Sequence, residues 1–272
     1  MLYDGLTAAL ATQHGKERVI APAFASLAGL SVVVPAALDT DALGTFTGEV
    51  PRPGSMHETA RMKARLGMAA SDLPFGIASE GSFGPHPIVP FLAIGHEVMI
   101  FIDDMHEIEV VEESFSEVTN FAALDLVAGA DVEAFLAQVR FPDHALVLRD
   151  GPRMSKGITS HDELAALLRT CSAAARLETD MRAHLNPTRM AEIGKMATRL
   201  ATRMATPCPA CAAPGYGTLR RETGLTCDDC GTPTPLVKHL VTGCALCGHE
   251  DHMPRSDGRT AASPAECPEC NP

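Results

Sequence analysis

The chain has no tryptophan and only two tyrosines among its 272 residues, and it lacks any long apolar segment. No apolar run reaches the ~18 residues that a membrane span needs, because charged residues such as Lys16 and Arg18 interrupt the apolar stretches. A secretory signal is not recognisable either. The sequence therefore predicts a cytoplasmic protein without a membrane-spanning part.

Basic residues are scarce as well. The chain holds 22 Lys and Arg against 34 Asp and Glu, which gives a net charge of −12. Residues 206–272 hold five basic and eight acidic residues. Nucleic acid needs Lys and Arg side chains that displace its counterions, so this balance disfavours nucleic acid as a partner. Apolar residues make up 46% of the chain, enough for one sizeable core and a small second module.

Cysteine is nearly absent from the first three quarters of the chain, where Cys171 stands alone in a helical pattern. The tail, in contrast, carries four Cys-x-x-Cys pairs, numbered first to fourth along the chain. Two such pairs can complete a tetrahedral Cys₄ zinc site. The pairs are Cys208/Cys211, Cys227/Cys230, Cys244/Cys247 and Cys267/Cys270.

The spacing of these pairs predicts two structural zinc sites. Fifteen residues separate the first pair from the second, and nineteen separate the third from the fourth, both within the usual zinc pattern. The middle gap is thirteen residues, so sequential pairing fits better than crossed pairing. Disulfides or redox pairs are the alternative. Four sulfur ligands leave no open position for catalysis, so we expect this tail to stabilise the fold or to dock a protein partner.

Before the tail, strand-like and helix-like apolar patterns alternate, which predicts an α/β domain over 1–205 and a zinc-binding domain over 206–272. A long polar loop, from about 39 to 55, is of a length that is usually functional. We expect strands over 6–12, 30–34, 75–79 and 145–148, a hairpin over 97–113, and helices around 19–28, 55–70, 131–139, 160–168 and 187–204.

Three charged residues of the first domain could carry chemistry. Lys16 follows a strand and a turn and opens a helix, where backbone N–H groups can hold phosphate. Lys63 lies on a helix face of small residues and could reach into the same cleft. Glu80 ends a predicted strand, a suitable place for a carboxylate that binds metal or orients water. Taken singly, each is more simply a surface or loop residue; their order and spacing favour a shared site.

This order of motifs resembles the inosine-triphosphate pyrophosphatase superfamily over roughly residues 6–205. The family's phosphate loop corresponds to Ala11–Lys16, and its Glu-Asn-Ala-x-x-Lys-Ala-Arg helix to Glu58–Arg65. Its acidic strand end, in the branch that reads Gly-Ile-Glu-Gly-Gly, is similar to Glu80-Gly81. The whole chain also resembles an uncharacterised bacterial family with a domain of unknown function, a resemblance that implies no activity.

The first resemblance implies a mixed sheet flanked by helices and a hydrolase that cleaves nucleoside triphosphates, non-canonical purine nucleotides among them, to monophosphate and pyrophosphate with Mg²⁺. A nucleotide or another phosphorylated small molecule would be its ligand. The implied catalytic residues are Glu80, Lys63 and Lys16, and the implied nucleotide-binding residues are Thr12, His14, Lys16, Glu58, Arg182 and His184.

The sequence also departs from that family. The Asn of the phosphate loop is absent, with His14 nearby, and Ser79 replaces one acid of an Asp-Asp pair. The aromatic residue that sandwiches the base has no clear counterpart, with Phe83 and Phe141 as the options. Two rival hypotheses therefore stand beside the enzyme: a nucleotide-binding protein without catalysis, and a zinc-ribbon docking or regulatory protein without a nucleotide site.

Overall fold

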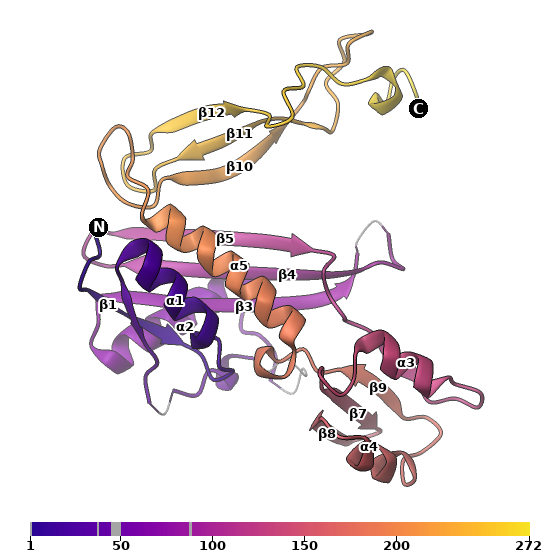
Figure 1. Ribbon diagram of the computed structural model, residues 1–272. Helices are drawn as coiled ribbons and strands as arrows, with labels where there is room; N and C mark the ends of the chain where they lie inside the picture. Colours follow the sequence, from indigo (N-terminus) through magenta and orange to yellow (C-terminus); the bar gives the residue numbers. More distant parts are fainter. Residues whose placement is uncertain (1, 37, 45–49, 87–88) are drawn as a thin grey trace.

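The largest unit of the protein is a five-stranded mixed sheet with the order β2-β1-β3-β4-β5 (Figure 1). The computed structural model describes residues 2–36, 38–44, 50–86 and 89–272. Strands β2, β1 and β3 run parallel, whereas β3, β4 and β5 form an antiparallel meander. The strands are β1 (Thr7–Ala11), β2 (Ser31–Val33), β3 (Phe75–Pro85), β4 (Ala93–Asp103) and β5 (Ile108–Ser116).

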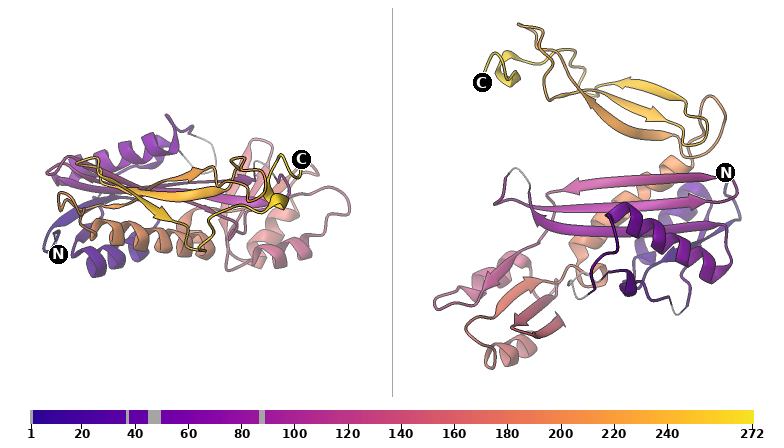
Figure 2. Two further views of the ribbon diagram at one scale, coloured as in Figure 1. Left: turned by 90° about the horizontal axis from the view of Figure 1, so that it is seen from above. Right: turned by 180° about the vertical axis from the view of Figure 1, so that it is seen from behind.

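Both faces of this sheet are covered by helices. Side chains alternate along a strand, so Leu10 and Ile77 face one core while Ala11 and Ala78 face another. Helices α1 (Glu17–Ala28) and α5 (Pro187–Met204) pack on the first face, and α2 (Met56–Ser71) packs on the second. Figure 2 shows α1 and α5 on one side of the sheet and α2 on the other.

Local sequence signals set the ends of these helices. Ser55 and Glu58 form a complete capping box at the start of α2, which satisfies N–H groups that the helix itself leaves unpaired. Asn186 caps α5 and is followed by Pro187 at the first helical position. Gly29 ends α1 in the left-handed conformation, with φ of 71°.

A second lobe lies within the predicted domain 1–205 and has its own apolar core. Its four-stranded sheet has the order β6-β9-β7-β8, and it sits beside the N-terminal end of α5 (Figure 1). The sequence patterns predicted two of its helices and one of its strands but did not separate this lobe from the main sheet. Its elements are β6 (Ala123–Asp125), α3 (Val132–Val139), β7 (Leu146–Asp150), β8 (Arg153–Ile158), α4 (His161–Leu168) and β9 (Arg176–Thr179).

The tail forms a three-stranded antiparallel sheet, here called the ribbon sheet, of β10 (Gly217–Thr223), β11 (Val237–Gly243) and β12 (Glu250–Pro254). It follows the C-terminal end of α5 (Figure 1). The main core continues past residue 205, because Cys208, Ala213 and Cys244 belong to the same buried cluster as Met204. Buried Arg203 donates hydrogen bonds to the carbonyls of Gly215 and Val111. The beginning of the tail is thus part of the main core.

Two sequence-based expectations need correction or restriction. The strand expected over 75–79 continues to Pro85 because it pairs with β4 along its whole length, so Glu80 lies within a strand rather than at its end. The predicted loop 39–55 falls partly on residues 45–49, which lie outside the described residues. Among the described residues, no helix is both long and apolar enough to cross a membrane.

Candidate functional site

A small pocket opens where β1 ends and β3 continues. Strand β1 pairs with β3 only as far as Ala11 and Ala78, so within the described part of the chain the next residues of β3 have no strand partner on that side. The pocket holds about 40 Å³ of space open to water. Its lining includes the predicted residues Thr12, His14, Lys16, Lys63 and Glu80, together with Gln13, Thr40, Ser79, Gly81 and Arg189.

Lys16 reaches into this pocket from the loop after β1. Its ammonium group donates to the carbonyl oxygen of Ser79 at 3.1 Å and to the Ser79 hydroxyl at 3.0 Å. The residue is only 8% exposed, and burial, followed by repulsion from Arg189, lowers the pKa of Lys16 to about 8. Among the described residues it forms no ion pair with a carboxylate. Lys16 is therefore a buried cation held by neutral oxygen atoms.

Glu80 points to the opposite face of β3 because it alternates with Ser79. There it forms an ion pair with Lys63 of α2, and both side chains are 9% exposed. Arg52 approaches the other carboxylate oxygen at 3.5 Å and donates to the carbonyl of Gly81 at 2.9 Å. The structure thus brings Lys63 and Glu80 together, and both are buried rather than surface residues.

A second buried ion pair lies on the Ser79 side of β3. Glu97 of β4 stands opposite Gly81 in register and accepts from Arg189 of α5 at 2.6 Å. A side chain at position 81 would collide with the guanidinium of Arg189 and the carboxylate of Glu97, so any residue larger than glycine would have to displace this ion pair. Sequence reasoning missed Glu97, although a charged residue that opens the apolar run 98–102 was a usable signal.

Three of the predicted nucleotide-binding residues, His14, Arg182 and His184, differ in their contacts. His14 stacks on His184 with ring centroids 5.1 Å apart. Burial, and then the charge of Lys16, lowers the pKa of His14 to about 3, so its imidazole is neutral at pH 7. Arg182 forms an ion pair with buried Asp180 at 2.6 Å. Neither Arg182 nor His184 is among the residues that line the pocket.

Glu58 stands apart from this group. Its carboxylate accepts from the backbone N–H of Ser55 at 2.8 Å, and that hydrogen bond is the first cause of its lowered pKa. The structure therefore uses Glu58 as a helix cap and does not place it in the pocket lining. Of the two aromatic options, Phe83 lies under the guanidinium of Arg189 at 5.2 Å, whereas Phe141 is buried in the core of the second lobe.

A larger hollow of about 580 Å³ lies between the end of the β3–β4 hairpin and the second lobe. Its described lining, which includes Phe91, Glu117 and Phe121, contains neither Lys nor Arg. A phosphate group would find no cation there. The small pocket at Lys16 is therefore the better candidate for an anionic ligand.

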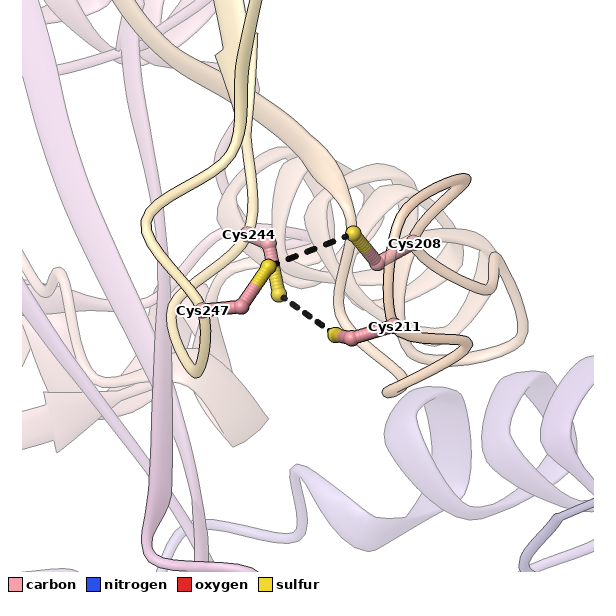
Figure 3. Close-up of side chains that lie close together, drawn as sticks. All are labelled: Cys208, Cys211, Cys244 and Cys247. Atoms are coloured by element: carbon pink, nitrogen blue, oxygen red, sulfur yellow. Dashed lines mark hydrogen bonds between the residues drawn. The ribbon is translucent and has the colours of Figure 1, made fainter.

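The eight cysteines of the tail gather into two groups of four (Figure 3 shows the first). The closest sulfur–sulfur distances are 3.7 Å in the first group and 3.6 and 3.8 Å in the second. All nine cysteines of the chain are free thiols. A tetrahedral zinc ion with Zn–S bonds of about 2.3 Å separates its sulfur ligands by about 3.8 Å, so both groups fit zinc. The first group is Cys208, Cys211, Cys244 and Cys247, and the second is Cys227, Cys230, Cys267 and Cys270.

The pairing within these groups is crossed, so the expectation of sequential pairing was wrong. The first and third pairs share one site, and the second and fourth share the other. The reason is the ribbon sheet, in which Gly217 at the start of β10 lies opposite Gly243 at the end of β11. A strand of seven residues spans about 23 Å, so consecutive Cys pairs come to lie at opposite ends of the sheet.

The thiols of the second group also favour a bound cation. Hydrogen bonds from Thr232 are the main cause that lowers the pKa of Cys230 to about 6. The pKa of Cys270 is raised, chiefly by its contact with Cys230. Neighbouring sulfurs that oppose each other's ionisation can all be thiolates only when a cation lies between them.

Comparison with known proteins gives a family and no activity. No curated protein and no solved structure matches this chain, so nothing in these comparisons supports the pyrophosphatase resemblance. One family matches residues 63–272, which include Lys63, Glu80 and all eight tail cysteines but not the loop with Lys16. Since this match spans well over half of the sequence, the chain belongs to the DUF6671 family, a domain of unknown function.

Proposed function

We propose that the protein is a Mg²⁺-dependent nucleoside triphosphate pyrophosphatase that binds the phosphates of its substrate at the end of β1. The observation that carries this proposal is Lys16, a buried ammonium group whose hydrogen bonds go to the neutral oxygens of Ser79. Glu97 and Glu80 attract this charge without contacting it, and each is already paired with another cation, Arg189 and Lys63. A buried charge without a direct counterion is costly, and an anionic ligand would supply one. The pocket at Lys16 is large enough for one phosphate group or a few water molecules, so the rest of a nucleotide would lie outside it.

The chemical roles follow from the two faces of β3. Lys16 and Lys63 approach β3 from opposite sides. A phosphate bound beyond the C-terminal end of β1 would therefore be attracted by both ammonium groups. Glu80 is a carboxylate that lines this pocket and would hold a magnesium ion or orient the attacking water. Magnesium commonly binds one or two carboxylates together with the substrate's phosphates, and when bound it would neutralise charge on the leaving pyrophosphate.

The family resemblance assigns purine recognition to His184 and Arg182, and we add His14 because it stacks on His184. The stacked, neutral His14 offers one hydrogen-bond donor and one acceptor rather than a positive charge. Such a group suits the edge of a base better than a phosphate. This is why we assign His14 to the nucleoside side and Lys16 to the phosphate side.

A nucleotide-binding protein without catalysis is the second candidate, and one observation favours it. Both oxygens of Glu80 already face cations, Lys63 on one side and Arg52 on the other. In that arrangement the carboxylate contributes to the fold and is not free to activate water. The two candidates share the phosphate site and differ in whether Glu80 leaves this ion pair when substrate binds.

Binding and turnover separate these candidates. Calorimetric titration of the full chain with a nonhydrolysable triphosphate should show binding, and Lys16→Ala should weaken it by roughly 1–3 kcal/mol. Lys195→Ala is the matched control, since Lys195 is an exposed lysine paired with Glu192. Equal affinity of the wild type, Lys16→Ala and Lys195→Ala for the triphosphate would contradict a phosphate site at Lys16. Binding without pyrophosphate release would leave the second candidate.

A further inference from the structure

One face of the ribbon sheet brings together three metal-binding side chains that belong to neither Cys₄ group. Glu222 of β10 lies opposite His239 of β11 in register. His252 of β12 lies opposite Val241, two residues beyond His239, so all three side chains point to the same face of the sheet. One ligand atom from each lies within 4.8 Å of the other two.

The nitrogen atom at the centre of this cluster has two close neighbours. Nε2 of His239 is 2.7 Å from a carboxylate oxygen of Glu222 and 2.7 Å from Nδ1 of His252. An imidazole nitrogen carries either one hydrogen or one lone pair. If Nε2 of His239 carries a hydrogen, that hydrogen can point at Glu222 or at His252 but not at both. If Nε2 carries a lone pair, the lone pair can accept a hydrogen bond from His252, but it then repels the nearby carboxylate of Glu222. A cation bound by all three atoms satisfies every one of them.

Neighbouring charges position the carboxylate and leave the cluster negative. Arg220 donates to the other oxygen of Glu222 at 3.0 Å and binds Glu250 with two hydrogen bonds of 2.7 and 2.8 Å. Glu250 thus offsets the charge of Arg220, while Glu222 keeps its own. An oriented carboxylate with a hydrogen-bonded second oxygen is the usual support of a metal ligand.

We propose that Glu222, His239 and His252 form a third zinc site, distinct from the two Cys₄ groups. Two imidazole nitrogens and one carboxylate oxygen are a donor set that suits zinc and leaves its fourth position open to water or another small ligand. Bonds of about 2.0 Å would separate tetrahedral ligand atoms by about 3.3 Å. The three side chains reach that spacing by small rotations, because all of them are at least partly exposed.

The test uses the full chain with zinc already in both Cys₄ groups. Calorimetric titration with Zn²⁺ should show one further equivalent, and His239→Ala and His252→Ala should each weaken that step by on the order of 100-fold. His96→Ala is the matched control, because His96 also pairs with a glutamate, Glu113, at 2.5 Å but belongs to no three-residue ligand group among the described residues. It should leave the further equivalent unchanged.

The two tightly held zinc ions report whether a variant still folds. His252→Ala and Glu222→Gln change partly exposed side chains, so both variants should retain those two ions and lose the third. Absence of a third equivalent in the wild-type protein would overturn the proposal. A third equivalent that persists at full affinity in His239→Ala and His252→Ala would also overturn it, because the ion would then bind elsewhere.

Discussion

Replacing Glu80 with glutamine removes one charge from a buried ion pair and keeps the shape of the side chain. Lys63 and Glu80 are each 9% exposed, so water screens their interaction little. Removing one partner of such a pair costs about 3–5 kcal/mol, because the other charge stays buried. The glutamine oxygen can still accept from Lys63, and we therefore expect the lower end, about 3 kcal/mol. In a chain of this size the melting temperature should fall by roughly 6–12 °C.

The double variant Glu80→Gln with Lys63→Met separates stability from catalysis. It removes both charges, and replacement of a buried pair by neutral side chains is often close to neutral. We expect urea and thermal unfolding to return to near wild-type values. Hydrolysis should stay at least about 10²-fold below wild type in both variants, since the carboxylate is missing in each. A loss below 1 kcal/mol in the single variant would contradict the buried-pair reasoning.

Three further predictions concern the pKa of Lys16, the pairing of the cysteines and the contribution of the tail to the core. The pKa of Lys16 is about 8 in the fold against an ordinary 10.5, so the unfolded chain binds more protons between these values. The free energy of unfolding of the wild type, measured relative to that of Lys16→Met, should then rise by on the order of 3 kcal/mol between pH 8 and pH 10.5. A difference between the two proteins that stays constant over this pH range in urea unfolding would refute the lowered pKa of Lys16. Crossed pairing predicts that Cys211→Ser with Cys247→Ser retains one zinc per chain and that Cys211→Ser with Cys230→Ser retains none; the reverse metal contents would indicate sequential pairing. A chain that ends at residue 205 should melt well below the full protein, because the core continues into the tail; an unchanged melting temperature would instead support the predicted domain 1–205 as a unit that folds by itself.

The helices and the strands of the main sheet could be predicted because their signals are local. The cap at Ser55, the Asn186-Pro187 start and the glycine at position 29 all act within one helical turn. The cysteine spacing likewise identified every thiol of the two Cys₄ groups. Lys16, Lys63 and Glu80 were selected by the order of their motifs, and the structure places all three around one pocket.

Contacts between distant segments could not be predicted in the same way. The pairing of Glu97 with Arg189 joins residues 92 positions apart, and it depends on how α5 crosses the sheet. The crossed cysteine pairs depend on the direction of three short strands, which the gap lengths alone do not encode. The cluster at Glu222 was invisible for the same reason, since its members become neighbours only through strand register.

Pyrophosphate release tests the proposed function most directly. The full chain, loaded with zinc and supplied with Mg²⁺, is incubated with a panel of canonical and non-canonical nucleoside triphosphates, beside Glu80→Gln and the surface control Lys195→Ala. The proposed site predicts equimolar monophosphate and pyrophosphate from at least one purine triphosphate, loss of turnover by about 10²-fold or more in Glu80→Gln, and unchanged turnover in Lys195→Ala. No pyrophosphate from any nucleotide, or equal release by wild type and Glu80→Gln, would contradict it.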